Sequence, residues 1–551
     1  AQWIGGGPED LVLYAPYLVI FDLEYTLAIE EGSTAAGFIF GANDSRLMDR
    51  YRNIFQVENA RNESYIKLVL DISGVDGSEN GTARLNVCRA GYTDTDDAQK
   101  PLGSFDIKAD FINNDNKYDE HTIKFSSIFG QISLSLDGSA DFFTVPEGDQ
   151  SQAMPPGMPP EMMRRMRRGA SVNLNPVGAG GNYIPFGMLC EIGFAADAGQ
   201  KAFFSEVKVT NNRLPNNTLF SEDLSGSEYN GIYSGYVSDR SSGLSVSDGK
   251  YIIDGGRDGA FVVADPGRNS TSMLRTEFST NGKKVKDARL YITSRGIYEV
   301  YMNGKRVGDD YYNPGLTQYN ITHMYQTYDV TGQVLNGENA LGAMLGEGWW
   351  SGLLSFGNIW NHFGDRQSLL AKLVITYADG TSDIITTNSN DWKHCNEGPL
   401  IYGSLDMGEV YDATREAAVD GWSEAGYDDG EWESACVIPL EGTAFTGTFS
   451  EMFGPATDFN YDKLSLIGQI GNNAGIYEII PAKSVEEVRP GVFVYNMGQN
   501  IVGVPRITIE NGKEGNMVTL RFSEILYPDL EESGKNVGMI MTENYRAALS
   551  Q

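Results

Sequence analysis

The feature that most constrains the fold is the recurrence of Asn-Gly and Asp-Gly pairs between short segments of alternating polarity. Three of these pairs lie at residues 137–138, 303–304 and 379–380. Such pairs supply the positive φ angles that tight hairpin turns require, and a polarity period of two is typical of strands with one buried face. We find no long amphipathic helical stretch beside them. The sequence therefore predicts an all-β fold built from tandem β-sandwich or jelly-roll domains.

Length and charge narrow the possible functions. The 551 residues exceed the roughly 250–300 at which single cores stop growing, so several domains are expected. The 42 Lys and Arg against 74 Asp and Glu give a net charge of −32, which disfavours nucleic acid as a partner because phosphates need cationic patches. No stretch approaches the ~18 apolar residues of a membrane span. Neutral partners such as glycans would not be repelled.

The cysteines and the first residue do not indicate in which cellular compartment the protein works. Four cysteines lie far apart without a CxxC unit, so we expect buried thiols in place of a zinc site. The chain begins with Ala1 and shows no charged-then-apolar leader. A processed signal peptide and a truncated fragment both explain this beginning.

One segment breaks the strand pattern. Residues 154–169 are rich in Pro, Met and Arg, and the prolines disfavour a helix or a central strand. We expect residues 150–182 to form a mobile insert without regular structure. The alternative, a polybasic tether to an anionic surface, is weakened by the strongly negative net charge of the chain.

The chain divides by position into three β-rich blocks. Residues 1–213 resemble a concanavalin- or laminin-G-like sandwich through the segments FDLEY (21–25), AGFIF (36–40) and AFFSEVKV (202–209). Domains of that kind bind glycans or act as spacers, and both roles stay open. Residues 214–270, rich in Ser, Gly, Asn and Asp, are predicted to form a connecting segment.

The second and third blocks resemble a specific family. In order along the chain stand LRTEF (274–278), GIYEVYMNGKRVG (296–308), GEGWW (346–350) and VYNMGQNIVG (494–503). This ordered series resembles the N-terminal β-domains of bacterial α-L-rhamnosidases, glycoside hydrolase family 78. The resemblance assigns residues 271–440 to the N-terminal jelly-roll domain. It assigns residues 441–551 to a second β-sandwich that is expected to be truncated.

The resemblance implies a secreted or periplasmic bacterial enzyme that removes terminal α-L-rhamnose by inverting hydrolysis. Its two catalytic carboxylates belong to a helical (α/α)6 barrel downstream, which is the expected partner of these domains, beside rhamnose-containing glycans. We therefore expect no catalytic residue within this chain, which alone is predicted to be inactive. Glu347 and Glu524 are the tempting acidic choices, but no motif marks either as catalytic.

Sugar binding is the more plausible chemistry for this chain. Aromatic rings stack on the apolar faces of sugars while polar side chains satisfy the hydroxyls. Residues 349–366 are rich in both types, and the candidate binding residues are Trp349, Trp350, Asn358, Trp360, His362, Asp365 and Arg366. The alternative is an aromatic core or an interface with the missing barrel. Calcium is a possible structural or sugar-bridging ion, with Asp309 and Asp310 as hard oxygen donors, although no metal ligand is assigned.

Two other functions compete with this interpretation. One is a stand-alone carbohydrate-binding or adhesion protein without catalysis. The other is a structural scaffold for a different hydrolase.

Overall fold

The structure is all-β, as the turn pairs predict. The computed structural model describes residues 1–6, 20–42, 64–78, 81–92, 96–128, 130–144, 170–175, 189–210, 218–222, 243–247, 249–264, 271–352, 354, 361–405, 408–449, 457–513, 518 and 520–541. Within these ranges, helix is limited to the single-turn α3 (Gly348–Ser351) and two short 3-10 turns. No helix in the described part of the chain is long and apolar enough to cross a membrane.

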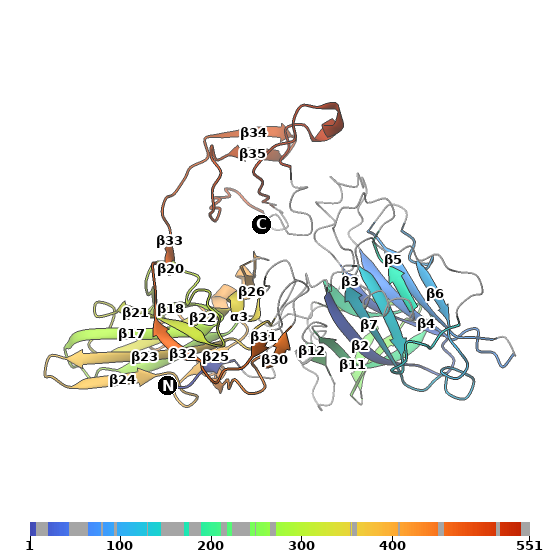
Figure 1. Cartoon of the computed structure of the whole chain (residues 1–551), viewed down its shortest axis with the longest axis horizontal. Helices are drawn as coiled ribbons and strands as arrows, with labels where there is room; N and C mark the ends of the chain where they lie inside the picture. Colours follow the sequence, from blue (N-terminus) through green and yellow to red (C-terminus); the bar gives the residue numbers. More distant parts are fainter. Residues whose placement is uncertain are drawn as a thin grey trace.

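The first sandwich consists of two facing antiparallel sheets (Figure 1, right). One sheet has the order β15-β10-β3-β4-β5-β6. The other runs β13-β14-β11-β2-β7-β8-β9, with β12 also pairing with β11. Their bounds are β2 Ile20–Ile29, β3 Ala35–Ala42, β4 Tyr65–Asp71, β5 Arg84–Ala90, β6 Gly103–Asp106, β7 His121–Ile128, β8 Gln131–Leu136, β9 Ala170–Asn173, β10 Glu191–Ala196, β11 Lys201–Thr210, β12 Thr218–Glu222, β13 Leu244–Ser247, β14 Lys250–Asp254 and β15 Ala260–Ala264.

The core of the first sandwich is aromatic. Tyr25 of β2 stacks on Phe38 of β3 with ring centroids 4.1 Å apart, and both side chains are fully buried. Successive residues of a strand point to opposite faces of the sheet. Along β7 and β8, buried and half-exposed side chains therefore alternate, and the buried row points into this core.

Two predictions for this region differ from the structure. The first sandwich includes four strands within residues 214–270, where a connection is predicted, because short apolar segments such as β14 and β15 are embedded in Ser- and Gly-rich sequence. β9 pairs with β8 inside the range 150–182, which is predicted to lack regular structure. Apart from residues 170–175, that range lies outside the described residues.

The second sandwich also has two sheets (Figure 1, left). Their orders are β29-β1-β23-β17-β21-β32, with β24 beside β23, and β19-β18-β22-β16-β25-β28. The bounds are β1 Ile4–Gly5, β16 Met273–Ser279, β17 Val285–Arg295, β18 Ile297–Met302, β19 Lys305–Arg306, β21 Thr322–Asp329, β22 Glu338–Gly346, β23 Ser368–Tyr377, β24 Ser382–Thr386, β25 Lys393–Cys395, β28 Glu433–Ser434, β29 Cys436–Val437 and β32 Ser465–Gly468.

One of the predicted hairpins illustrates the turn chemistry in this sandwich. Asn303 and Gly304 adopt φ angles of 51° and 77° between β18 and β19, which pair directly. Positive φ at both central residues is the geometry that Asn-Gly favours in a two-residue turn. The predicted turn at this position is confirmed.

The N-terminus belongs to the second sandwich and not to the first. Ile4 of β1 pairs with Leu369 of β23 and Val437 of β29, and the N-terminus lies beside the sheet that contains β23 (Figure 1). A β-carbon added to Gly6 would lie 2.7 Å from the Ser272 hydroxyl oxygen. The chain therefore leaves the second sandwich at Gly6 and returns to it beside the same point, so the first sandwich is an insertion. A prediction that keeps residues 1–213 together misses this arrangement.

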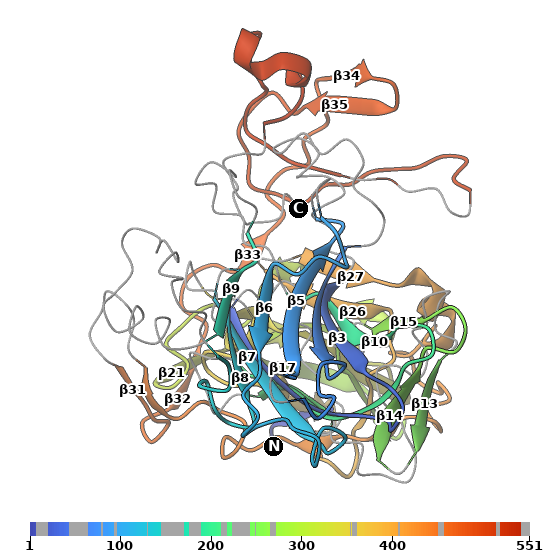
Figure 2. The same ribbon diagram turned by 90° about the vertical axis from the view of Figure 1, so that its right-hand side faces the viewer.

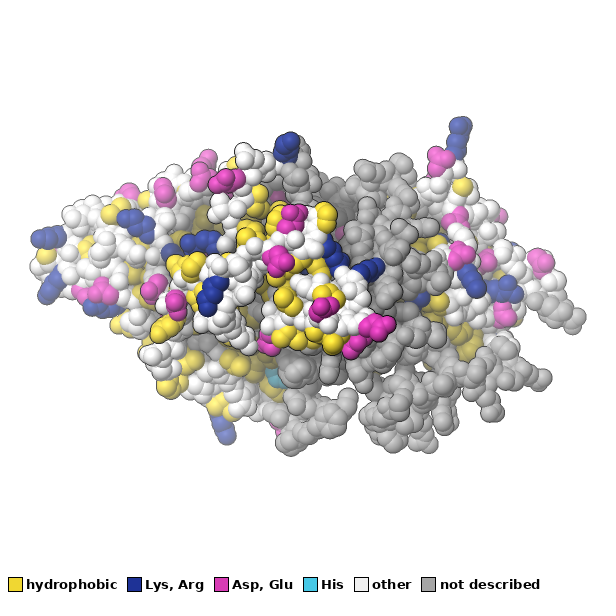
Figure 3. All heavy atoms as spheres, turned by 90° about the horizontal axis from the view of Figure 1, so that it is seen from above, with side chains coloured by type: hydrophobic (Ala, Val, Ile, Leu, Met, Phe, Trp, Pro, Cys, Tyr) yellow, Lys and Arg dark blue, Asp and Glu magenta, His cyan; other side chains and the backbone are white. Residues whose placement is uncertain are grey.

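The C-terminal part has little core of its own. Beyond β32, β33 (Ala474–Gly475) pairs with β20 (Asp310–Tyr311). Among the described residues, β34 (Ser484–Arg489) pairs only with β35 (Val492–Asn496), and both views show this hairpin apart from the two sandwiches (Figures 1 and 2). Large apolar side chains remain exposed here, including Ile470, Tyr477, Ile479, Val502 and Val504, each at least 72% accessible. Apolar side chains are visible among acidic ones on the face that carries this segment (Figure 3).

Candidate functional site

Trp350 lies at the centre of an aromatic cluster. It follows β22 on α3, where Gly348 turns the chain with a φ of 53°. Its side chain is 1% exposed, and its ring centroid lies 6.0 Å from Tyr319 and 6.2 Å from Phe363. Trp350 therefore has no open face for a sugar, and its contribution is packing.

The cluster joins segments that are far apart in sequence. We call it the aromatic cluster; its buried members are Tyr319, Trp350, Phe363, Phe445 and Phe459, and Trp349, Leu354, Leu440, Ala444 and Tyr461 pack against it while partly buried. Of the two candidate tryptophans that the structure describes, Trp349 retains exposed surface at the edge of this cluster. Asn358 and Trp360 lie outside the described residues.

His362 contacts the aromatic cluster through its ring. Its imidazole meets Phe363 and Phe459 edge-on, with centroids 4.9 Å and 5.0 Å away. Burial lowers the pKa of His362 to about 4, because the charged form loses its hydration. At neutral pH the ring is uncharged, with one nitrogen that donates and one that accepts a hydrogen bond. That is suitable chemistry for a sugar hydroxyl.

Asp365 and Arg366 pair with each other. The Arg366 Nη1 lies 3.1 Å from Asp365 Oδ2, and both side chains are mostly buried, at 16% and 19% exposure. Burial raises the pKa of Asp365 to about 6, and the neighbouring Arg366 guanidinium partly offsets this rise. The Asp365 amide donates to the carbonyl of Thr443 at 2.9 Å, which anchors the segment to the chain that carries Phe445.

The two aspartates considered as possible calcium donors differ in their surroundings. The Asp310 carboxylate accepts hydrogen bonds from Asn313 at 2.7 Å, Tyr328 at 2.9 Å and Asn473, whereas Asp309 is exposed. In the described ranges, no group of three or more His, Cys, Asp or Glu side chains is arranged to hold a metal ion.

Sequence analysis missed several residues that build this region. Arg295, at the end of β17, is buried and lies with its guanidinium carbon 5.5 Å from the Trp350 ring centroid. Tyr319, Phe445 and Phe459 supply most of the other cluster rings. Their local sequences carry no common motif, so only the tertiary fold identifies them.

Comparison with known proteins identifies the domain types. Residues 283–449 match the α-L-rhamnosidase N-terminal domain, and residues 486–549 match the bacterial α-L-rhamnosidase concanavalin-like domain. The resemblance to bacterial α-L-rhamnosidases is confirmed. An α-L-rhamnosidase of Streptomyces avermitilis is 39% identical over 51% of this chain, and one of an Alteromonas species is 37% identical over 50%.

The matched rhamnosidases are much longer than the matched region. The aligned parts amount to 24% and 26% of those two proteins, so the chain spans about a quarter of the length of the curated relatives it matches. A crystal structure of a Streptomyces avermitilis α-L-rhamnosidase with L-rhamnose aligns over all of this chain and 40% of the other. Its TM-score is 0.46, at 24% identity.

Proposed function

We propose that this chain is a non-catalytic front portion of a glycoside hydrolase that removes terminal α-L-rhamnose from glycans by inverting hydrolysis outside the cytoplasm. The observation that carries the proposal is the ordered match of residues 283–449 and 486–549 to two rhamnosidase domain types. The names of the curated relatives agree with it. Inverting hydrolysis needs two carboxylates about 6.5–9.5 Å apart across a pocket, and we assign no such pair in this chain.

The function of these domains would be to face carbohydrate and to support a catalytic domain. Two side chains support the first role: the half-buried Trp349, which packs against the aromatic cluster, and the neutral His362, which contacts Phe363 and Phe459 of the same cluster. The exposed apolar side chains between residues 465 and 541 support the second, since exposed apolar patches mark interaction surfaces. The proposed partner of that surface is the helical barrel.

An activity assay tests the catalytic part of the proposal. Purified chain is incubated with a chromogenic aryl α-L-rhamnoside, with the full-length Streptomyces relative as positive control. We expect no turnover by the chain. Turnover that a single Glu or Asp substitution within the chain abolishes would refute the proposal that it is non-catalytic.

A binding assay tests the carbohydrate-facing role. Trp349→Ala should weaken L-rhamnose binding about fivefold to a hundredfold, as expected for the loss of one stacked ring. Trp349→Phe keeps an aromatic face and should retain most of the affinity. Calorimetry with and without calcium separates a metal requirement from stacking. Equal affinity of wild type and Trp349→Ala for L-rhamnose would show that Trp349 does not contact the sugar.

A further inference from the structure

His121 of the first sandwich is a polar residue in a row of core-facing side chains. It opens β7, where the buried Ile123 and Phe125 follow at alternate positions, and it lies opposite the buried Leu27 of β2. Only 3% of its surface is exposed. A histidine buried in this way needs a hydrogen-bond partner for each ring nitrogen, so the chemistry of those partners determines its protonation state.

Both partners of the His121 ring are acceptors. Nδ1 lies 2.9 Å from Oδ2 of Asp137 in the turn after β8, and Nε2 lies 3.1 Å from the main-chain carbonyl oxygen of Asn116. A neutral imidazole has one N–H group and one lone pair, whereas the imidazolium has two N–H groups. Only the protonated ring can therefore donate to both partners.

The charged groups around His121 favour the proton. Asp137 contacts the ring from the turn after β8, and Asp119 acts on it from the loop before β7. Glu120 is already paired with Lys250 of β14 at the surface. Burial by itself would lower the pKa of His121, but its hydrogen bonds and the two aspartates raise it above its ordinary value.

The loop before β7 is held together by Asn116. The Asn116 side chain accepts from the Asn113 amide at 2.8 Å and donates to the Phe111 carbonyl at 2.7 Å, so residues 111–119 form one unit. The Asn116 carbonyl is therefore the point at which His121 holds this loop against the turn after β8.

We propose that His121 is a protonation-dependent clamp, which ties the loop of residues 111–119 to the turn at Asp137 when the ring is charged and releases it when the ring is neutral. In the neutral ring the remaining proton stays on Nδ1, because the Asp137 carboxylate is the charged acceptor. The Nε2 lone pair then faces the Asn116 carbonyl, and two acceptors repel each other. Lys117, which donates to the Val75 carbonyl at 2.8 Å, keeps the loop attached elsewhere, so the opening is local.

The direction of the pH dependence follows from the raised pKa. The stability that the clamp contributes is fully present below pH 6.5, the ordinary pKa of histidine, and is lost as the pH rises through the pKa of His121 in the folded protein. This end of the first sandwich is therefore tighter in acidic than in alkaline surroundings. The inference is independent of the proposed function.

The test uses the full chain from about pH 5 to about pH 9, on both sides of the ordinary histidine pKa. The chain has four histidines, so NMR of carbon-13-labelled histidine rings can follow His121, assigned as the signal that His121→Gln removes. Hydrogen exchange, corrected for the intrinsic effect of pH, follows the loop through the amides of Asn113 and Asp119, which donate within it.

Asp137→Asn is the test variant. It removes the charge but keeps an oxygen that can accept from the Thr122 amide, which donates to Asp137 Oδ1 at 2.8 Å, and asparagine tolerates the φ of 49° at this position. Asp141→Asn is the matched control, because Asp141 follows the same turn with its side chain 85% exposed and paired with Lys108. Thermal melts show whether each variant folds.

We expect His121 to titrate above pH 6.5 and exchange in the loop to rise about tenfold to a hundredfold through the same midpoint, the equivalent of one hydrogen bond to a charged group. Asp137→Asn should move both midpoints to lower pH, whereas Asp141→Asn should leave them in place. A His121 midpoint at or below pH 6.5, loop exchange without a step at that midpoint, or an equal shift in the two aspartate variants would overturn the proposal.

Discussion

The guanidinium carbon of Arg295 lies 4.3 Å from the ring centroid of Trp3. This contact joins the N-terminal segment to the end of β17, next to the pairing of β1 with β23. Burial lowers the pKa of Arg295 to about 10, and its Nη1 donates to the carbonyl of Ile438 at 3.0 Å. The electron-rich ring therefore stabilises a cation that has lost most of its hydration.

Replacing Trp3 by Ala should lower the free energy of unfolding of the second sandwich by about 1–2 kcal/mol, because a desolvated cation–π contact is lost. Trp3→Phe, which keeps a ring face, should cost less. None of the seven tryptophans lies within residues 20–264, so denaturation followed by tryptophan fluorescence reports the second sandwich. Equal stability of wild type and Trp3→Ala would show that the contact contributes nothing measurable.

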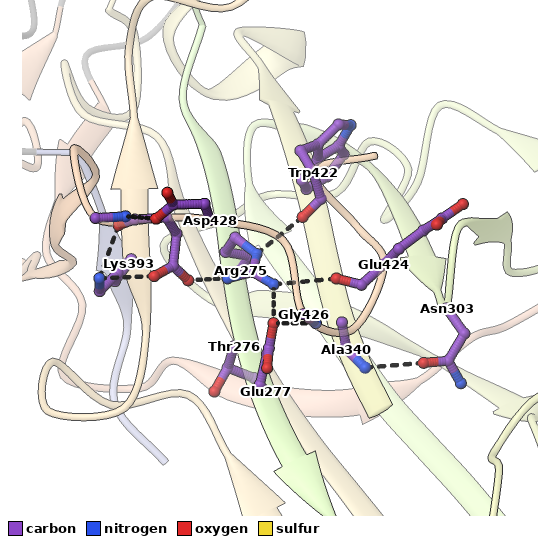
Figure 4. A network of polar contacts seen from close by, with 12 residues as sticks. Arg275, Thr276, Glu277, Asn303, Ala340, Lys393, Trp422, Glu424, Gly426 and Asp428 are labelled. Atoms are coloured by element: carbon purple, nitrogen blue, oxygen red, sulfur yellow. Dashed lines mark hydrogen bonds and ion pairs between the residues drawn. The ribbon is translucent and has the colours of Figure 1, made fainter. Parts of the chain in front are cut away.

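Arg275 has a fully buried side chain that pairs with Glu277 and Asp429, which are 35% and 25% exposed, and Asp429 keeps a second partner in Lys393 (Figure 4). Replacing Arg275 by Met should destabilise the same sandwich by about 2–3 kcal/mol, because the charged hydrogen bonds of the guanidinium are lost while water and Lys393 still reach the carboxylates.

Arg289→Met is the matched control. Arg289 forms ion pairs with Asp287 and Asp329 but is 36% exposed, so its loss should cost less than about 1 kcal/mol. Similar urea midpoints for the two variants would contradict this difference.

The stability of the second sandwich should depend on His323 between pH 4 and 6.5. Burial lowers the pKa of His323 from 6.5 to about 4, so in this window the unfolded chain binds a proton that the folded chain does not. The free energy of unfolding should therefore rise with pH, by up to roughly 3 kcal/mol from this residue. The raised pKa of Asp365 acts in the opposite direction, because its contribution to stability falls as pH rises towards 6.

The variant His323→Gln isolates this effect. Its stability should rise less steeply from pH 4 to 6.5 than that of the wild type, while the glutamine can still donate to the Ser294 carbonyl, which the His323 ring contacts at 2.8 Å. His121→Gln, in the first sandwich, should leave the fluorescence transition of the second sandwich unchanged. Parallel pH profiles for wild type and His323→Gln would rule out the assignment.

The β34–β35 hairpin should promote self-association of the chain. Val485 lies opposite Tyr495, Phe493 is on the same face of β35, and all three are more than half exposed. A two-stranded hairpin is marginal alone, and an exposed apolar face favours association. Phe493→Ser with Tyr495→Ser should lower the apparent mass in concentrated solution, measured by sedimentation. Leu335→Ser, at a loop position that is 55% exposed, is a control outside the hairpin. An unchanged mass in the double variant would exclude this face.

Local chemistry predicted the fold class and the turns. Asn303-Gly304 is an example, because the preference of these two residues for positive φ angles does not depend on the tertiary contacts around them. The insertion was not predictable in this way, since β1 has two residues and its partners Leu369 and Val437 are distant in sequence. Likewise, Trp349 and Trp350 are equivalent in the sequence. Only the direction in which α3 leaves β22 buries Trp350 and leaves Trp349 at the edge.

The closeness of Gly6 and Ser272 makes the first sandwich a module that can be removed. The inserted segment leaves the second sandwich and returns to it at a single point. The sheets of the second sandwich therefore keep their register whatever the length of the inserted segment. The entropic cost of closing a loop grows only slowly with its length. Replacing the first sandwich by a domain of another size should therefore cost the second sandwich little stability. A short turn joining β1 to β16 would leave the pairing of Ile4 with Leu369 intact. The inserted sandwich is therefore free to diversify, or to disappear, independently of the domain that carries it.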